Sequence, residues 1–204
     1  MIGFYYFSPV EKFMYSRFKK LVLVCTLASM SSLVTAESLA LTIVSSQGQE
    51  RGLVIINLNS TAAPNHVARI KTLTEKGLYD GVAFHRVIAG FMAQTGDVEF
   101  GNKKSFNASS VGSGSSDYDD LKAEFSGISF KTGMVGMARS RYIHSANSQF
   151  FIMTKSQTGL DGQYTVVGKV IAGMDVVNAI KQGSKTENGK VTNPDYIKEA
   201  VILP

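Results

Sequence analysis

Two segments of the sequence place hydrogen-bond donors beside aromatic side chains at the spacing of a strand. The first, Phe84–Asp97, reads FHRVIAGFMAQTGD, and the second, Asn147–Ile152, reads NSQFFI. In an extended strand, Gln149 and Phe151 would share one face, while Phe150 would point to the other. One face could then fill a core and the other could line a groove. Such a groove would offer hydrogen bonds from a positioned arginine or amide beside apolar surface.

Residues for covalent or metal chemistry do not occur in any recognised spacing. The sequence has no Gly-rich phosphate loop, no GxSxG nucleophile turn and no HExxH zinc helix. The histidines His66, His85 and His144 are far apart, and none forms a pair at ligand spacing. His144 and the acidic pair Asp119–Asp120 are typical of solvated loops. We therefore expect neither a metal nor a cofactor.

The elements that must position these donors are mostly short strands. Apolar, β-branched runs bounded by Gly, Ser or Asp predict eight of them. They are Leu39–Val44, Gly52–Leu58, Ala83–Val87, Phe91–Thr95, Met134–Met137, Gln149–Thr154, Thr165–Val170 and Lys198–Leu203. The long polar stretch Gly101–Lys122 is predicted to be a surface loop.

Only two helices are predicted. The first begins at Pro64, which suits a first helical turn, and ends at Gly77 as a left-handed cap. The second is Met174–Lys181, with Gly183 closing it. Eight short strands and two helices predict a mainly β fold, a closed eight-stranded antiparallel barrel capped by two α-helices. Phe84, Phe130 and Phe150 are expected to fill its core.

Residues 1–36 have the pattern of a secretory signal peptide. Basic residues precede the apolar run Leu21–Ala28, and Val34-Thr35-Ala36 provides small residues before a cleavage site. Translation from Met14 would give a more ordinary leader. Two alternatives stay open: a lipoprotein beginning at Cys25, which bulky Val24 disfavours, and a retained membrane anchor. Cleavage after Ala36 would leave residues 37–204 as one compact domain without stable membrane insertion.

The basic character of the sequence lies mostly in this leader. The whole chain of 204 residues has 21 basic and 16 acidic residues, a formal charge of +5. Residues 1–36 hold four of the basic residues and one acidic residue, so the remainder carries +2. We therefore expect no nucleic-acid partner.

From Glu37 to Pro204 the sequence resembles the cyclophilin family of peptidyl-prolyl cis-trans isomerases. The segment Phe84–Asp97 is close to that family's long Phe-His-Arg signature, and Ser148–Ile152 and Leu160–Gly162 recur in its order. The family fold is an eight-stranded barrel closed by two helices. The Met-Ala-Arg and Ser-Ala-Asn-Ser-Gln-Phe-Phe stretches are bacterial in style, which together with the leader implies a periplasmic or secreted protein.

The resemblance implies a role for each matching position. Arg86 would be the catalytic arginine, and Gln94 and Gln149 would orient it or bond the substrate backbone. The pocket for the substrate proline ring would consist of Phe91, Met92, Phe151 and Leu160. Ala138 and Arg139 would lie beside the residue that precedes proline, and Tyr164 stands where well-studied relatives have His.

Two positions depart from the family pattern. Thr95 replaces a Gly in the usual Gln-Gly-Gly-Asp, and Gly159 stands where many relatives have Trp or another aromatic. Without that aromatic wall the groove is open on one side, so we expect weak binding of cyclosporin.

The resemblance implies a cofactor-independent isomerase that acts on X–Pro bonds of unfolded or flexible polypeptides and assists the folding of exported proteins. We expect it to be a monomer, since nothing in the sequence suggests an interface. Two alternatives are a peptide-binding chaperone or adaptor with little turnover, which Gly159 favours, and a barrel that binds an apolar small molecule. Bulky inward aromatics argue against the last of these.

Overall fold

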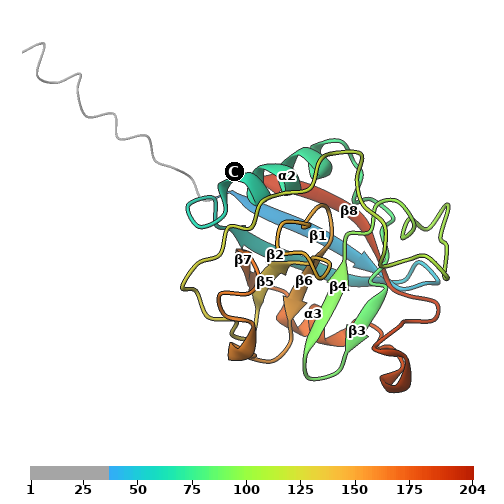
Figure 1. The fold of residues 1–204 in the computed structure, drawn as a ribbon. Helices are drawn as coiled ribbons and strands as arrows, with labels where there is room; N and C mark the ends of the chain where they lie inside the picture. The colour runs from blue at the N-terminus through green and yellow to red at the C-terminus, as the bar shows by residue number, and fades with distance from the viewer. Residues whose placement is uncertain (1–36) are drawn as a thin grey trace, which may run out of the picture. The chain divides into compact units, whose positions relative to one another are not determined.

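The computed structural model describes residues 37–204 (Figure 1). The predicted signal peptide, residues 1–36, lies outside the described residues. Among the residues that the structure does describe, no helix is both long and apolar enough to cross a membrane.

The fold is a single curled sheet of eight antiparallel strands in the order β3-β4-β6-β5-β7-β2-β1-β8 (Figure 1). The predicted strands are all present, with ends shifted by a few residues. Their bounds are β1 Ser38–Val44, β2 Glu50–Leu58, β3 Arg86–Ile88, β4 Met92–Thr95, β5 Met134–Met137, β6 Phe150–Met153, β7 Val166–Ala172 and β8 Tyr196–Leu203.

Closure of the barrel by a continuous ladder is not confirmed, because β3 and β8 remain the edges of the sheet. The predicted strand over 83–87 pairs regularly only from Arg86 onward, and Ala83 meets Tyr196 in an isolated bridge. Single backbone bonds, such as Phe84 N–H to the carbonyl of Asp195 at 2.9 Å, join the two edges. The segment opposite β3 contains left-handed Asn188, whose φ of 52° breaks the extended backbone that a ladder needs.

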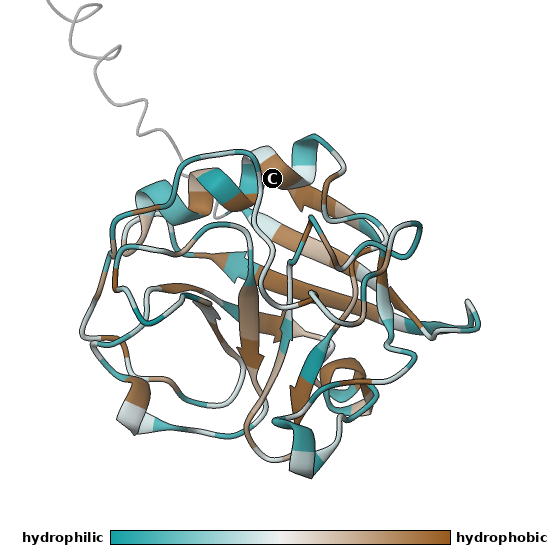
Figure 2. Ribbon diagram, turned by 45° about the vertical axis from the view of Figure 1, so that its right-hand side comes forward, coloured by the Kyte–Doolittle hydropathy of each residue, from teal (hydrophilic) through white to brown (hydrophobic). Residues whose placement is uncertain are grey.

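The apolar side chains form a main core inside the curled sheet and a smaller cluster outside it. The main core includes Phe84 and Phe150, both fully buried as predicted, and the inward residues of β1 and β2. Brown apolar segments follow these strands in Figure 2, whereas the connecting loops are mostly teal. Phe130 is also fully buried, but it belongs to the smaller cluster, so its assignment to the barrel core was wrong.

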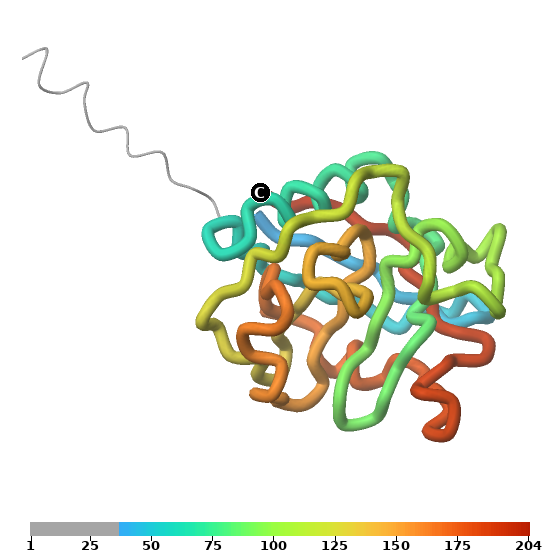
Figure 3. Tube along the Cα trace, viewed as in Figure 1, coloured from blue at the N-terminus to red at the C-terminus, as the bar shows by residue number. Residues whose placement is uncertain are grey.

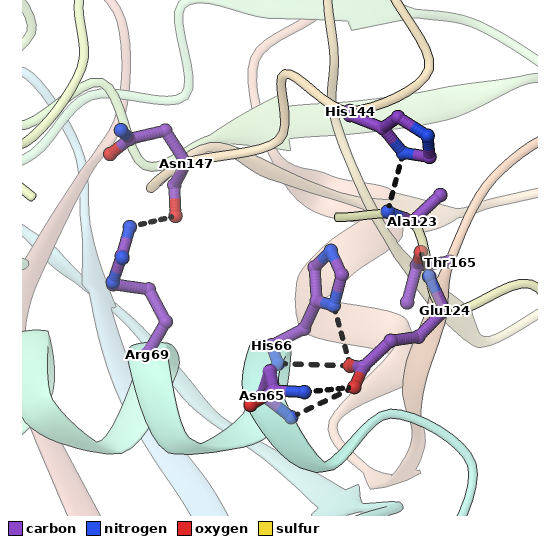
Figure 4. A network of polar contacts seen from close by, with 8 residues as sticks. All are labelled: Asn65, His66, Arg69, Ala123, Glu124, His144, Asn147 and Thr165. Atoms are coloured by element: carbon purple, nitrogen blue, oxygen red, sulfur yellow. Dashed lines mark hydrogen bonds and ion pairs between the residues drawn. The ribbon is translucent and has the colours of Figure 1, made fainter. Parts of the chain in front are cut away.

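Helix α2, Pro64–Glu75, begins at the predicted proline. It ends just before Gly77, where the chain leaves the helix axis in a left-handed conformation with a φ of +66°. Its N-cap residue, Ala63, has no side chain that could accept a hydrogen bond. Glu124 supplies the missing acceptor from a distant part of the chain (Figure 4). Its carboxylate accepts the backbone N–H groups of Asn65 and His66, both at 3.1 Å, and the ring Nδ1 of His66 at 2.6 Å. The first turn of the helix is therefore capped by another segment.

The second helix, α3 Met174–Ala179, is two residues shorter than predicted. Ile180 leaves the helical region with ψ 135°, and Gly183 does not cap the helix but donates its N–H to Val87. Two short 3-10 turns, η1 Thr158–Leu160 and η2 Lys185–Glu187, complete the described elements.

The long connection between β4 and β5 runs along α2 (Figure 3). Arg69 donates to the carbonyl of Asp119 at 2.8 Å. The Cζ atom of Arg69 lies 4.9 Å from the centre of the Tyr118 ring. His144, predicted to be solvated, accepts the N–H of Ala123 at 3.1 Å (Figure 4). The predicted surface loop is thus attached to the helix by specific contacts.

Candidate active site

Arg86 lies on the edge strand β3, directly opposite Gln94 of β4. Its guanidinium donates from Nε to the carbonyl of Asn188 at 3.0 Å and from Nη2 to the side-chain oxygen of Asn188 at 3.0 Å. Its Nη1 donates to Oε1 of Gln94 at 3.2 Å and lies 3.7 Å from the sulfur of Met92. Neutral oxygens on two sides therefore fix the plane of the guanidinium against an apolar side chain.

Gln94 is itself held by Gln149, which immediately precedes β6. Nε2 of Gln94 donates to Oε1 of Gln149 at 2.9 Å. Nε2 of Gln149 in turn donates to the backbone carbonyls of Gly112 at 3.1 Å and Gly114 at 2.9 Å. The three predicted polar residues thus form one chain of hydrogen bonds, Gln149 to Gln94 to Arg86.

The apolar residues predicted for the pocket gather in the smaller cluster, beside the guanidinium. The cluster comprises buried Met92, Phe130, Met134, Phe151, Met153 and Val166, with partly buried Ile88, Phe91, Ile128, Ala138, Leu160 and Tyr164 packed on it. Phe130 stacks on Phe151 with ring centroids 5.7 Å apart. A Cβ at Gly136 would lie 2.6 Å from the Phe151 ring, so only glycine allows this packing.

Arg139 and Tyr164 lie at one end of the cluster. Tyr164 packs edge-on to Phe151 with centroids 5.6 Å apart, and the Arg139 guanidinium lies 4.5 Å from the centre of the Tyr164 ring. Arg139 also donates from Nε and Nη2 to the carbonyl of Gln163, at 3.1 and 3.0 Å. Arg139 is therefore held beside the cluster by a cation–π contact and a carbonyl, both neutral partners.

Leu160 reaches the cluster from η1, which Asp161 attaches to the segment before β5. The carboxylate of Asp161 accepts the Phe130 N–H and the Ser129 hydroxyl, both at 2.7 Å. These bonds lower the pKa of Asp161, since they favour its charged form. These contacts attach η1, and with it Leu160, to the segment that carries Phe130.

The two departures from the family pattern have different structural settings. Thr95 is fully buried and donates its hydroxyl to the carbonyl of Ala83 at 2.9 Å, so this strand position accommodates a side chain. Nothing lies within 4 Å of a Cβ built on Gly159. The space beside η1 is therefore open.

The electrostatic setting of Arg86 favours donation to a neutral acceptor. Within residues 37–204 no carboxylate forms an ion pair with it, and its partners are oxygens of neutral groups. Burial lowers the pKa of Arg86, but a guanidinium still remains protonated. Of its five N–H donors, three are bound to oxygen and a fourth points to the Met92 sulfur, a weak acceptor, so one N–H on Nη2 is left without a partner among the described residues. No cluster of metal-ligating side chains occurs in this part of the chain.

Asn188, which accepts from Arg86 across 102 residues of sequence, was not among the predicted site residues. The local signal was Asn188-Gly189, a pair typical of tight turns. It predicts a turn with a left-handed residue but not the arginine that the turn contacts.

Comparisons with known proteins point to one family. The family model "Cyclophilin type peptidyl-prolyl cis-trans isomerase/CLD" matches residues 42–202. A probable peptidyl-prolyl cis-trans isomerase of Brucella suis is 60% identical over 152 residues, covering 74% of this chain and 78% of that protein. Peptidyl-prolyl cis-trans isomerase CYP21-1 of Arabidopsis thaliana is 36% identical over 167 residues, covering 77% and 71%.

Among solved structures, the chain is similar to cyclophilin AquaCyp293 from Hirschia baltica. The TM-score is 0.64 at 25% sequence identity, covering 80% of this chain and 73% of that one. The family match spans nearly all of the described residues and includes every predicted site residue. The chain therefore belongs to the cyclophilin-type peptidyl-prolyl cis-trans isomerases.

Proposed function

We propose that Arg86 catalyses the cis-trans isomerisation of X–Pro bonds in substrates held on the apolar cluster around Met92 and Phe151. The observation that carries this proposal is the placement of the Arg86 guanidinium. It is fixed by Asn188 and Gln94, and its Nη1 lies 3.7 Å from the Met92 sulfur.

The barrier to isomerisation is the loss of amide resonance, about 18–20 kcal/mol. In the twisted transition state the proline nitrogen becomes pyramidal and regains a lone pair, which the planar amide does not offer. A guanidinium N–H of Arg86 donates to that lone pair and so binds the transition state more strongly than the substrate. No bond of the substrate backbone breaks, so the reaction needs no nucleophile.

The neighbouring groups make this donation effective. Gln94 and Asn188 fix the guanidinium before the substrate arrives, so little reorganisation is needed during reaction. The apolar cluster holds the proline ring and lowers the local dielectric, which strengthens the hydrogen bond. Ala138 and Arg139, at one end of the cluster, lie beside the residue that precedes proline.

A proline-limited peptide isomerisation assay on the purified chain tests this proposal. The wild type should accelerate isomerisation, and Arg86→Ala should lose most of that activity while keeping its thermal stability. Wild-type activity that survives Arg86→Ala would contradict the assigned mechanism.

The second candidate function is a peptide-binding adaptor with little turnover, favoured by the open space beside Gly159. It predicts peptide binding without acceleration in the same assay. The open space also supports weak binding of cyclosporin, since an aromatic wall is missing there.

We further propose that the protein is exported to the periplasm or secreted as a monomer, where it acts on proline-containing segments of other exported proteins. The basic and apolar pattern before Ala36 supports this location. Cell fractionation and N-terminal sequencing test it, and the exported product should begin at Glu37. A product that stays in the cytoplasm with its first residues intact would refute the export proposal.

A further inference from the structure

Asp97 closes the segment Phe84–Asp97, and the mechanism above gives it no role. Its side chain is fully buried, and no cation of residues 37–204 forms an ion pair with it. Its charge is instead satisfied by four backbone N–H groups. Oδ1 accepts those of Glu99 at 3.2 Å and Phe100 at 2.8 Å, and Oδ2 accepts those of Gly112 at 2.6 Å and Gly114 at 3.0 Å. Such charge-assisted bonds are stronger than those between neutral groups.

Gly112 and Gly114 both approach the Asp97 carboxylate closely. A Cβ on Gly114 would lie 2.2 Å from Oδ1 of Asp97, so a larger residue would push the loop away. Gly112 has a φ of +98°, which glycine adopts readily. The loop is thus shaped to bring two N–H groups onto one carboxylate oxygen.

The backbone carbonyls of the same two glycines bind Gln149. The carbonyls of Gly112 and Gly114 both accept from Nε2 of Gln149, so both hydrogens of that amide are committed. The Oε1 of Gln149 must then face Gln94 and accept from its Nε2. This leaves the Oε1 of Gln94 to accept from Arg86.

The direction of every bond in this chain therefore depends on the loop carbonyls. If the loop moved, Gln149 could rotate its amide and present its NH₂ group to Gln94. Gln94 would then rotate in turn and place its own NH₂ group against the Arg86 guanidinium. Two donors facing each other would expel the arginine from its position.

We propose that Asp97 is a positioning residue for Arg86, which it orients through the Gly112–Gly114 loop, Gln149 and Gln94. The proposal rests on the catalytic role of Arg86 proposed above. Asp97 touches no substrate, and its effect on turnover passes through the two glutamines.

The test replaces Asp97 with Asn, which has one oxygen and so can serve only one of the two pairs of N–H groups. We expect kcat/KM for a proline peptide to fall about tenfold, as a hydrogen bond of ordinary strength would give, with KM nearly unchanged. The side-chain amide NMR signals of Gln94 and Gln149 should shift. In a Gln149→Leu background, Asp97→Asn should cause less than about a twofold further loss, since the connection is already broken.

The matched control is Asp195→Asn, at another buried carboxylate that binds Arg51 and the N–H of Lys181. It should lower thermal stability but keep kcat/KM within about twofold and leave the glutamine amide signals in place. If Asp97→Asn fails to fold, Gly114→Ala replaces it, because its Cβ would lie 2.2 Å from Oδ1 of Asp97 and so displaces the loop from the carboxylate.

The proposal is overturned if the Asp97 variant retains the activity of the Asp195 control, or if its loss adds fully to that of Gln149→Leu. Wild type and Arg86→Ala are measured alongside. An inactive wild type, or an active Arg86→Ala, refutes the role of Arg86 itself. An active wild type with inactive Arg86→Ala and unaffected Asp97→Asn refutes only the role of Asp97.

Discussion

Replacing Arg86 with Lys tests whether the geometry of the guanidinium, rather than its charge, accelerates the reaction. The structure binds Nε and Nη2 to Asn188 and Nη1 to Gln94, at 3.0–3.2 Å. A lysine has one nitrogen at the end of a flexible chain, so it cannot satisfy both neighbours and the substrate at once. The Lys variant therefore keeps the charge and loses the orientation.

The expected size of the effect follows from one hydrogen bond made by a charged donor in the transition state. Such a bond contributes up to about 3 kcal/mol, so Arg86→Ala should lower kcat/KM by about 150-fold. Arg86→Lys should recover part of this, with a loss of about tenfold. Because the bond exists only in the transition state, kcat should fall while KM changes little.

The assay is the acceleration of X–Pro isomerisation in a short peptide, with thermal unfolding measured for each variant. The matched control is Arg69→Lys, at an arginine on α2 that also binds backbone carbonyls but lies outside the candidate site. It should keep kcat/KM within about twofold of wild type. The reasoning is refuted if Arg86→Lys also stays within twofold, or if Arg86→Ala raises KM and leaves kcat unchanged.

Three further substitutions have defined outcomes. Glu124→Ala removes the helix cap and leaves buried His66 without its partner, so the free energy of unfolding should fall by about 3 kcal/mol and the thermal midpoint by about 6–12 °C. The control, Glu75→Ala at an exposed position, should have little effect. Equal midpoints for the two variants would contradict the capping argument. Burial lowers the pKa of His85 to about 4, so the folded state resists protonation, and the unfolding free energy should fall by about 3 kcal/mol as pH drops from 6.5 to 4. His85→Leu should reduce this fall, which denaturant titrations at several pH values would measure, and an unchanged fall would count against burial as the cause. Gly159→Trp fills open space beside η1 and should strengthen inhibition by cyclosporin roughly tenfold; unchanged inhibition would show that the missing wall does not limit binding.

Local sequence patterns predicted the elements of the fold because their causes are local. Proline at the start of α2 and glycine after its end act through their own backbone preferences. Apolar, β-branched runs bounded by Gly, Ser or Asp predicted the strands in the same way. Closure of the barrel was predicted too strongly, since the left-handed Asn188 in the segment opposite β3 has no apolar pattern to reveal it.

The candidate site was predicted where one motif carries it and missed where distant segments meet. Arg86 and Gln94 face each other across a hairpin of adjacent strands, so their pairing follows from chain order. Asn188, 102 residues from Arg86, follows from no spacing in the sequence. Phe130 was correctly predicted to be buried, but hydrophobicity alone does not say on which side of the sheet a side chain packs.

The cap that Glu124 places on α2 has a consequence for co-translational folding. The chain is made from its N-terminus, and His66 is completed 58 residues before the glutamate that it needs. A short isolated helix is marginal in water, so the start of α2 stays frayed until the later segment has left the exit tunnel. The first turn of α2 can therefore be completed only after the segment that carries Glu124 has been synthesised.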